Sequence, residues 1–148
     1  MSGKQEELRG IVRIGETDIK GDRKIYIGLT QIKGVSFMFS NAICKVLGLD
    51  PHGKIGALTD EQIKKIEDVL RNPQKYGIPS WLYNRRKDYT TGKDIHLIGS
   101  ELEFKQKEDI RRLIDIKAYR GIRHMLGLKV RGQRTRSTGR KGRTVGVV

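Results

Sequence analysis

The clearest secondary-structure signal in the chain is the stretch TDEQIKKIEDVLRNP, residues 59–73. Thr59 is a suitable N-cap, and Gln62 three residues later completes a capping box, in which each side chain bonds the other residue's backbone. The apolar positions recur at helical spacing: Ile63, Ile66 and Leu70. The Asn-Pro pair at the end stops the pattern. The stretch therefore predicts a helix with one buried face.

A second helix is predicted immediately upstream, over residues 36–47, with Gly48 as its stop. Its buried face is predicted at four positions: Phe39, Ile43, Val46 and Leu47. The residues before this helix are less regular. Residues 10–30 alternate loosely, which favours short strands, or a strand leading into a short helix, around a turn at 20–22. From Thr30 the pattern becomes helical and predicts a short helix that ends near Gly34.

The turn between these two helices is a candidate phosphate-binding element. A glycine turn that feeds a helix N-terminus presents free backbone N–H groups to an anion. The candidate residues are Lys33, Gly34 and Ser36. A glycine between helices is at least as often a simple stop, and the same helices could present their outer face to a protein instead.

Residues 72–100 are rich in proline and glycine and predict a loop-rich insertion. Four aromatic residues lie within it: Tyr76, Trp81, Tyr83 and Tyr89. These side chains either pack the loop onto the helices or stack on nucleic-acid bases beside the cations at 85–87. Packing is the favoured interpretation.

A last long helix is predicted to begin at Ser100, with a capping box completed by Glu103. Its predicted buried face contains Ile110, Leu113 and Ile114. The sequence thus indicates a mainly α fold in four segments. These are an N-terminal region of strands and helices over 1–71, an insertion over 72–100, a long helix and basic turn over 101–126, and an extended basic arm over 127–148.

Charge is concentrated at the C-terminal end of the chain. The 148 residues carry a formal net charge of +14, and residues 116–148 contain ten Lys and Arg side chains and no acid. Unpaired cations at this density favour a polyanionic partner. A segment with no acids and few aromatics is predicted to be an extended arm that its partner orders. A merely solubilising tail would not require seven Arg against three Lys.

The strongest local pattern is RGIRH at 120–124, followed by Gly127 and by VRGQRT at 130–135. Cations two or three residues apart, interleaved with glycine, let a backbone follow a phosphate chain. The candidate RNA-binding residues are Arg120, Arg123, His124, Lys129, Arg131, Gln133, Arg134, Arg136, Arg140, Lys141 and Arg143. Within this set, His124 either bonds a phosphate or base edge or packs under the helix, and Gln133 either reads a base edge or braces the arm.

Signals for enzymatic chemistry are weak, and an enzyme is not expected. Residues 48–54 match the start of a phosphate-binding P-loop, but Ile55 stands where a Ser or Thr must reach magnesium. Three histidines fall on separate segments without neighbouring ligands: His52, His96 and His124. Cys44 lies in an apolar helix, where it is expected to be a small core residue. No catalytic residue, metal site or cofactor is predicted.

The single cysteine excludes an intramolecular disulfide framework and favours a reducing compartment. The first residues lack the apolar stretch of a secretory signal, and no window approaches the roughly 18 apolar residues of a membrane span. A cytoplasmic protein without membrane contact is therefore expected.

These features together resemble a known family, the universal small-subunit ribosomal protein number thirteen. The resemblance rests on the spacing of RGIRH, Gly127 and VRGQ, and it extends upstream over residues 26–34 and 36–70. Residues 72–100 and 138–146 are similar to the archaeal and eukaryotic branch of the family rather than the bacterial one.

Two positions depart from that pattern. Ser36 stands where many family members have a second glycine, and Lys129 stands where a proline is common. The first departure bears on how closely a phosphate can approach the turn, and the second adds a charge to the arm.

The resemblance implies a helix-two-turns-helix N-terminal region and a place in the head of the small ribosomal subunit. The implied partners are small-subunit ribosomal RNA, the nineteenth small-subunit protein, and the large subunit through its RNA and its fifth protein. It also implies that the arm, from about Arg131 onward, runs toward tRNA in the peptidyl site. The alternative is a helix-hairpin-helix DNA-binding protein, architectural or repair, which the glycine turn suggests.

Overall fold

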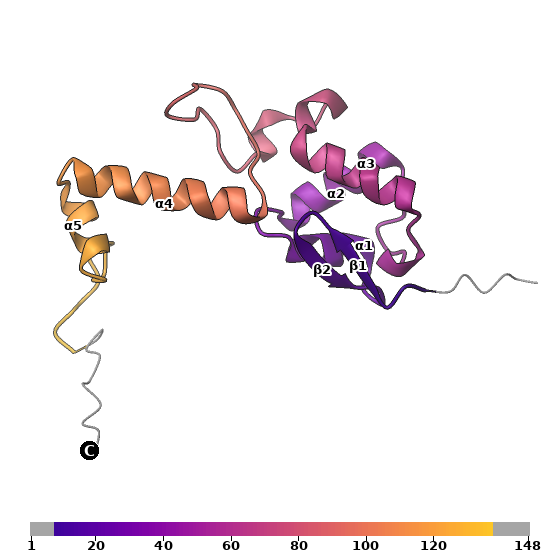
Figure 1. Cartoon of the computed structure of the whole chain (residues 1–148), viewed down its shortest axis with the longest axis horizontal. Coiled ribbons are helices and arrows are strands. Elements are labelled where there is room, and N and C mark those ends of the chain that lie inside the picture. The colour runs from indigo at the N-terminus through magenta and orange to yellow at the C-terminus, as the bar shows by residue number, and fades with distance from the viewer. Residues whose placement is uncertain (1–7, 138–148) are drawn as a thin grey trace, which may run out of the picture. The chain divides into compact units, whose positions relative to one another are not determined.

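The computed structural model describes residues 8–137 and is mainly helical, with one two-stranded sheet (Figure 1). In chain order its elements are β1 (Ile11–Ile14), β2 (Thr17–Lys20), α1 (Ile25–Gly28), η1 (Leu29–Gln31), α2 (Phe37–Leu47), η2 (Ile55–Ala57), α3 (Asp60–Arg71), η3 (Pro73–Tyr76), η4 (Ser80–Leu82), α4 (Gly99–Asp115) and α5 (Tyr119–Met125). The mainly α prediction is confirmed.

By its internal contacts the chain forms two compact units, Met1–Glu103 and Phe104–Val148. The division falls inside α4. The first unit holds the sheet, the core and the insertion, and the second holds most of α4, α5 and the arm. The four segments predicted from the sequence are a finer division and stay a prediction.

Helix α3 forms as its sequence predicts, because its start is set by local bonds. The Gln62 backbone N–H donates to Thr59 Oγ1 at 3.3 Å, and the Thr59 N–H donates to Gln62 Oε1 at 3.0 Å, which completes the capping box. Ile66 and Leu70 are fully buried. The helix ends at Arg71, before the Asn-Pro pair.

Helix α2 also has the predicted bounds. Ser36 caps it by accepting the Phe39 N–H at 3.3 Å, and Gly48 ends it in the left-handed conformation. The predicted place of Val46 on the buried face is wrong, because this side chain is exposed. Ser40 and Cys44 complete the buried face instead, and the Ser40 hydroxyl is satisfied by donating to the Tyr26 carbonyl at 2.8 Å. Cys44 is a core residue, as predicted.

The N-terminal region differs from its prediction in detail. β1 and β2 form an antiparallel hairpin around Gly15 and Glu16, and the predicted turn at 20–22 follows the hairpin. The short helix begins at Ile25, and its 3-10 continuation ends at Gln31, so the prediction from Thr30 to Gly34 was late. A short apolar stretch fits either strand or helix, and only tertiary packing decides between them.

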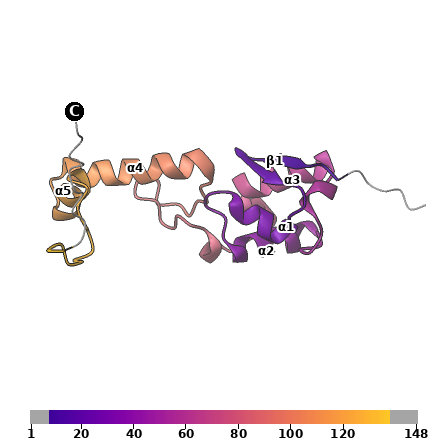
Figure 2. The ribbon, with the colours of Figure 1, turned by 90° about the horizontal axis from the view of Figure 1, so that it is seen from below.

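The core of the first unit lies between the hairpin and the helices. It contains aliphatic side chains from β1, β2, α1, α2 and α3, and Phe39 is its largest fully buried side chain. Strand β1 lies beside α3 (Figure 2). Among the residues that the structure describes, no helix is both long enough and apolar enough to cross a membrane.

The aromatic residues of the insertion divide into two pairs. Tyr83 is buried and its hydroxyl donates to the Ile78 carbonyl at 2.8 Å, while the half-buried Tyr76 donates to Asp68 Oδ2 at 2.6 Å. Trp81 and Tyr89 remain 64% and 75% exposed. The packing interpretation is therefore confirmed for the first pair only.

Helix α4 begins at Gly99, one residue before the predicted N-cap. Its first turn is anchored to the rest of the first unit, because the Ser100 N–H donates to Glu16 Oε2 at 3.1 Å and Glu103 pairs with Lys33. The bond to Ser100 lowers the pKa of the Glu16 carboxyl. The predicted buried face is only half-buried: Ile110, Leu113 and Ile114.

Candidate nucleic-acid interface

The second unit is built around a helical hairpin. After Asp115 the chain turns through Ile116 and Lys117, and the Ala118 N–H donates to the Leu113 carbonyl at 3.1 Å. Helix α5 then packs on α4 through Gly121, which is buried. A Cβ at this glycine would lie 2.1 Å from the Leu113 carbonyl oxygen, so only glycine permits this approach. Gly121 therefore serves helix packing, and it does not let the backbone follow a phosphate chain, because the residue lies inside a helix.

The end of α5 is set by a Schellman motif. Gly127 has a φ of +65° and donates to the His124 carbonyl at 3.1 Å, while the Leu128 N–H donates to the Arg123 carbonyl at 2.9 Å. The left-handed conformation costs a glycine little, which accounts for glycine at this position. This turn ends the helix and starts the arm.

The three candidate residues of α5 lie on one side of the helix. Arg120, Arg123 and His124 follow the spacing i, i+3, i+4, which places them on one face. Arg120 is exposed and the other two are half-buried. The Arg123 guanidinium lies 5.9 Å from the Tyr119 ring centroid, and its Nε donates to the Lys129 carbonyl at 3.0 Å. Arg123 thus braces the start of the arm with one nitrogen of its guanidinium.

The described part of the arm, residues 127–137, contains neither helix nor strand. Its candidate residues are all exposed: Lys129, Arg131, Gln133, Arg134 and Arg136. Gln133 folds back, and its Oε1 accepts the Arg131 backbone N–H at 3.2 Å. This contact fits the bracing alternative for Gln133, and a contact to a base edge stays a prediction. Three further candidates lie outside the described residues: Arg140, Lys141 and Arg143.

Composition alone predicts an extended arm from residue 116, whereas the predicted segments start the arm at residue 127, after a basic turn. The first part of this acid-free segment instead folds as α5, over Tyr119–Met125. The cause is the close contact of Gly121 with the backbone of α4, which local composition does not reveal.

The turn at residues 33–36 is engaged by its own chain. The Lys33 carbonyl accepts the Gly99 N–H at 2.9 Å, and a Cβ at Gly34 would lie 2.4 Å from the Leu97 carbonyl oxygen. Ser36 uses its hydroxyl as the cap of α2. Glycine at position 34 is therefore required by a neighbouring protein segment, and a phosphate contact at this turn stays a prediction.

Comparison with known proteins identifies the family of the chain. The family model for ribosomal protein S13/S18 matches residues 13–141. The chain belongs to the ribosomal protein S13/S18 family.

The relatives cover the chain almost completely. The small ribosomal subunit protein uS13 of Staphylothermus marinus is 63% identical over 94% of this chain and 92% of its own length. Those of Aeropyrum pernix and Nanoarchaeum equitans are 57% and 54% identical, each over 97% of this chain and 95% and 94% of their own lengths. These archaeal relatives confirm the branch to which the sequence was assigned.

For a member of this family, sequence reasoning missed one surface. A second face of α5 and its C-cap is apolar and exposed: Ile122 at 40%, Met125 at 60% and Leu126 at 60%, with Tyr119 at 72% between this face and the cations. The spacing of these residues would have shown an amphipathic helix had the segment been predicted as one. Exposed apolar residues grouped in this way mark an interaction site.

A cavity of about 680 Å³ lies in the first unit, between the end of α3 and residues 93–101. Its lining mixes acids and bases, including Glu67, Arg71 and Lys93, so it has no single charge preference. His96 also lines it and stacks on Phe39 with a centroid separation of 3.8 Å. Within residues 8–137, no three His, Cys, Asp or Glu side chains are grouped so that they could hold a metal ion.

Proposed function

We propose that this chain is a structural component of the small ribosomal subunit that binds ribosomal RNA through α5 and the arm. The observation that carries the proposal is the exposed row of cations at Lys129, Arg131, Arg134 and Arg136, in a segment without a single acid after Asp115. Family membership supports the ribosomal setting, because the relatives are named small ribosomal subunit proteins.

The proposed binding mechanism depends on how the start of the arm is attached to α5. The Schellman motif at Gly127 and the bond from Arg123 to the Lys129 carbonyl hold the first arm residues against α5. The cations of α5 and those of the arm then form one continuous sequence of phosphate contacts. Guanidinium groups suit this task because their planar donors match phosphate oxygens.

Additional partners are proposed from the family resemblance. The arm from about Arg131 contacts tRNA in the peptidyl site, and the folded part of the chain bridges to large-subunit RNA and the fifth large-subunit protein. The exposed apolar side of α5 suits a protein partner, for which the nineteenth small-subunit protein is the candidate. The chain would then act in the cytoplasm, on the ribosome.

A salt series tests the electrostatic mechanism. If eight cations of α5 and the arm contact phosphates, the logarithm of affinity for small-subunit RNA should fall with the logarithm of salt at a slope of about −6 to −7. A slope near zero would contradict the proposal. Retention of the protein on small subunits after a high-salt wash gives an independent test.

Competition distinguishes RNA from DNA. An RNA-shaped site should prefer small-subunit RNA over duplex DNA at fixed salt, because A-form grooves and 2′-hydroxyls differ from those of B-form DNA. Equal or stronger competition by duplex DNA would support the helix-hairpin-helix alternative instead. A repair lyase of that class would further form a covalent adduct with abasic-site DNA under borohydride.

A further inference from the structure

The insertion contains a closed loop at residues 85–95 whose base is held by paired backbone bonds. The Ile95 N–H donates to the Arg85 carbonyl at 2.8 Å, and the Arg85 N–H donates back at 3.3 Å. Closer to the tip, the Asp88 N–H donates to the Lys93 carbonyl at 2.9 Å, and the Gly92 N–H donates to the Asp88 carbonyl at 2.7 Å. We call residues 85–95 the loop finger.

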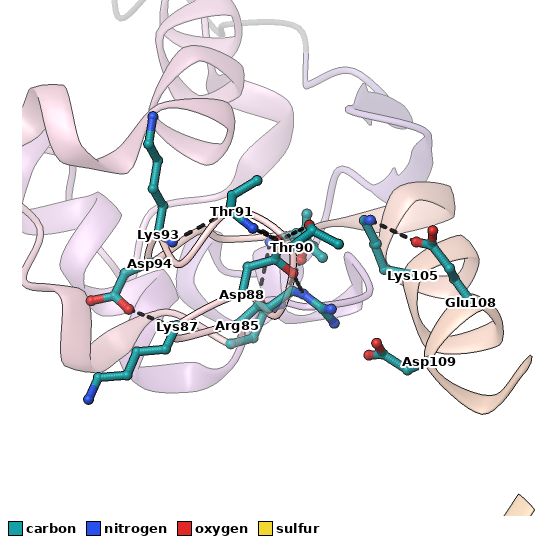
Figure 3. Close-up of polar contacts among 12 residues, drawn as sticks. Arg85, Lys87, Asp88, Thr90, Thr91, Lys93, Asp94, Lys105, Glu108 and Asp109 are labelled. Atoms are coloured by element: carbon teal, nitrogen blue, oxygen red, sulfur yellow. Dashed lines mark hydrogen bonds and ion pairs between the residues drawn. The ribbon is translucent and has the colours of Figure 1, made fainter. Parts of the chain in front are cut away.

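A buried carboxylate organises the tip of the loop finger (Figure 3). Asp88 accepts bonds from Arg85 Nε at 2.5 Å, from Thr90 Oγ1 at 2.6 Å, and from the Thr91 N–H and Oγ1 at 3.2 and 3.1 Å. These donors hold the pKa of the Asp88 carboxyl well below its usual range, with the Thr90 hydroxyl as the largest cause. The tip is therefore preorganised rather than free to collapse.

The same bonds determine which charges face the solvent. Both acids of the loop finger are engaged, because Asp88 is buried and the half-buried Asp94 accepts the Lys87 N–H at 2.7 Å. Three cations remain exposed: Arg86, Lys87 and Lys93. In Figure 3 the Lys87 and Lys93 side chains extend away from the Asp88 cluster in different directions. The exposed surface of the loop finger is thus positive.

An aromatic side chain lies among these cations. Tyr89 directly follows the organising carboxylate and is 75% exposed. An aromatic ring on a rigid support, flanked by cations, provides both parts of a contact to unpaired RNA, since rings stack on bases of any identity and cations hold the adjoining phosphates. Within residues 85–95 no acid is exposed, so this surface is complementary to a polyanion such as RNA.

We propose that the loop finger is a second RNA contact, separate from the arm, in which Tyr89 stacks on an unpaired base and Arg86, Lys87 and Lys93 contact the flanking phosphates. This inference rests on the proposed RNA-binding function. It assigns a ligand class to a segment that neither the family match nor the arm explains.

The test uses the full-length chain and a transcript of the small-subunit RNA. Tyr89→Leu should weaken binding about tenfold, because a stacked base contributes a factor of this order. Tyr89→Phe keeps the ring and is the matched control, so its affinity should stay within about twofold of the unchanged protein. Both variants change an exposed side chain. Helical circular dichroism equal to that of the unchanged protein will show that each variant is folded. Photocrosslinking of the unchanged protein to 4-thiouridine-labelled transcript should attach RNA at residues 86–93.

The outcomes separate the two proposals. If the unchanged protein binds the transcript with a steep salt dependence, but Tyr89→Leu binds equally well and no crosslink forms at 86–93, the loop finger proposal is overturned and the arm mechanism stands. If the unchanged protein shows no salt-dependent RNA binding, the proposed function itself fails. In assembled subunits, a crosslink from Tyr89 to a protein instead of RNA would also overturn the inference.

Discussion

Removing the imidazole of His96 should make the protein more resistant to mild acid. His96 is only 8% exposed, stacks on Phe39, and has no hydrogen-bond partner for either ring nitrogen among the residues described. Burial lowers the pKa of His96 to about 4, because an imidazolium at this position would lose its hydration without gaining a partner. The folded protein therefore holds this side chain neutral over most of the pH range.

The free energy at stake follows from the difference between the folded and unfolded pKa values. In the unfolded chain the imidazole takes up a proton near pH 6.5, whereas in the folded protein it does so near pH 4. The unfolded state therefore binds more protons between these values, and stability falls as the pH is lowered from 6.5 toward 4. At ~1.36 kcal/mol for each pH unit the full loss is roughly 3 kcal/mol, of which roughly 2 kcal/mol is already lost at pH 5. This is a large part of the ~5–15 kcal/mol that stabilises an ordinary domain.

The assay compares urea unfolding of the unchanged protein and His96→Leu at several values between pH 7.5 and 5. Leucine has a similar size and does not titrate, so only the difference in pH dependence matters and any constant effect of the substitution cancels. Carboxylates with a lowered pKa, such as Glu16 and Asp68, contribute equally to both proteins and lose their stabilising effect at more acidic pH. The unchanged protein should lose roughly 2 kcal/mol more than the variant by pH 5.

Parallel pH profiles for the two proteins would refute this reasoning. So would an imidazole titration of His96, followed by NMR in the folded protein, with a midpoint near 6.5. Either result would mean that the ring is hydrated or finds a proton acceptor, and that its stacking on Phe39 does not exclude water.

Substitutions at four other positions test separate parts of the structure. Gly121→Ala should destabilise the α4–α5 hairpin by about 1–3 kcal/mol despite the better helix propensity of alanine, because the new Cβ meets the Leu113 carbonyl; amide exchange in α5 will measure this, and slower exchange would contradict it. Thr59→Ala should lower the free energy of unfolding by about 1 kcal/mol, since the Gln62 N–H loses its Oγ1 acceptor, whereas Thr59→Ser keeps a hydroxyl and should retain most of the stability. Arg131→Ala and Arg134→Ala should each weaken RNA binding about fivefold and make the salt slope shallower by about 1, without loss of helical circular dichroism; unchanged affinity in both would exclude these residues as phosphate contacts.

The parts of the fold that the sequence predicted correctly are those fixed by local interactions. The bounds of α3 follow from Thr59 and Gln62, whose bonds lie within one helical turn. Those of α2 follow in the same way from Ser36 and Gly48. In both helices the capping residues and the apolar pattern are found within the same short stretch of sequence. No distant contact is therefore needed to define the helix.

The errors occurred where a distant segment decides the structure. The sequence left strand and helix open for residues 25–27 and gave a clear helical pattern only from Thr30. The helix begins at Ile25, whose N–H donates to the Gly53 carbonyl, 28 residues away, at 2.8 Å. Helix α5 depends on the fit of Gly121 against α4, which composition cannot reveal. Among the candidate site residues, the charge pattern located the exposed cations of the arm. It did not show that Arg123 and Gln133 also make bonds within the chain.

Because the arm is attached to α5, the number of residues in this helix determines the direction in which the arm leaves it. Because the turn at Gly127 and the bond from Arg123 to Lys129 attach the arm to the last turn of the helix, the exit point moves with the helical repeat. Deleting one residue within α5 would rotate that exit by about 100° and shift it by about 1.5 Å along the axis. The arm would keep every charge but would leave the helix in a different direction. Its binding site therefore depends on the length of the seven-residue helix α5 as much as on its arginines.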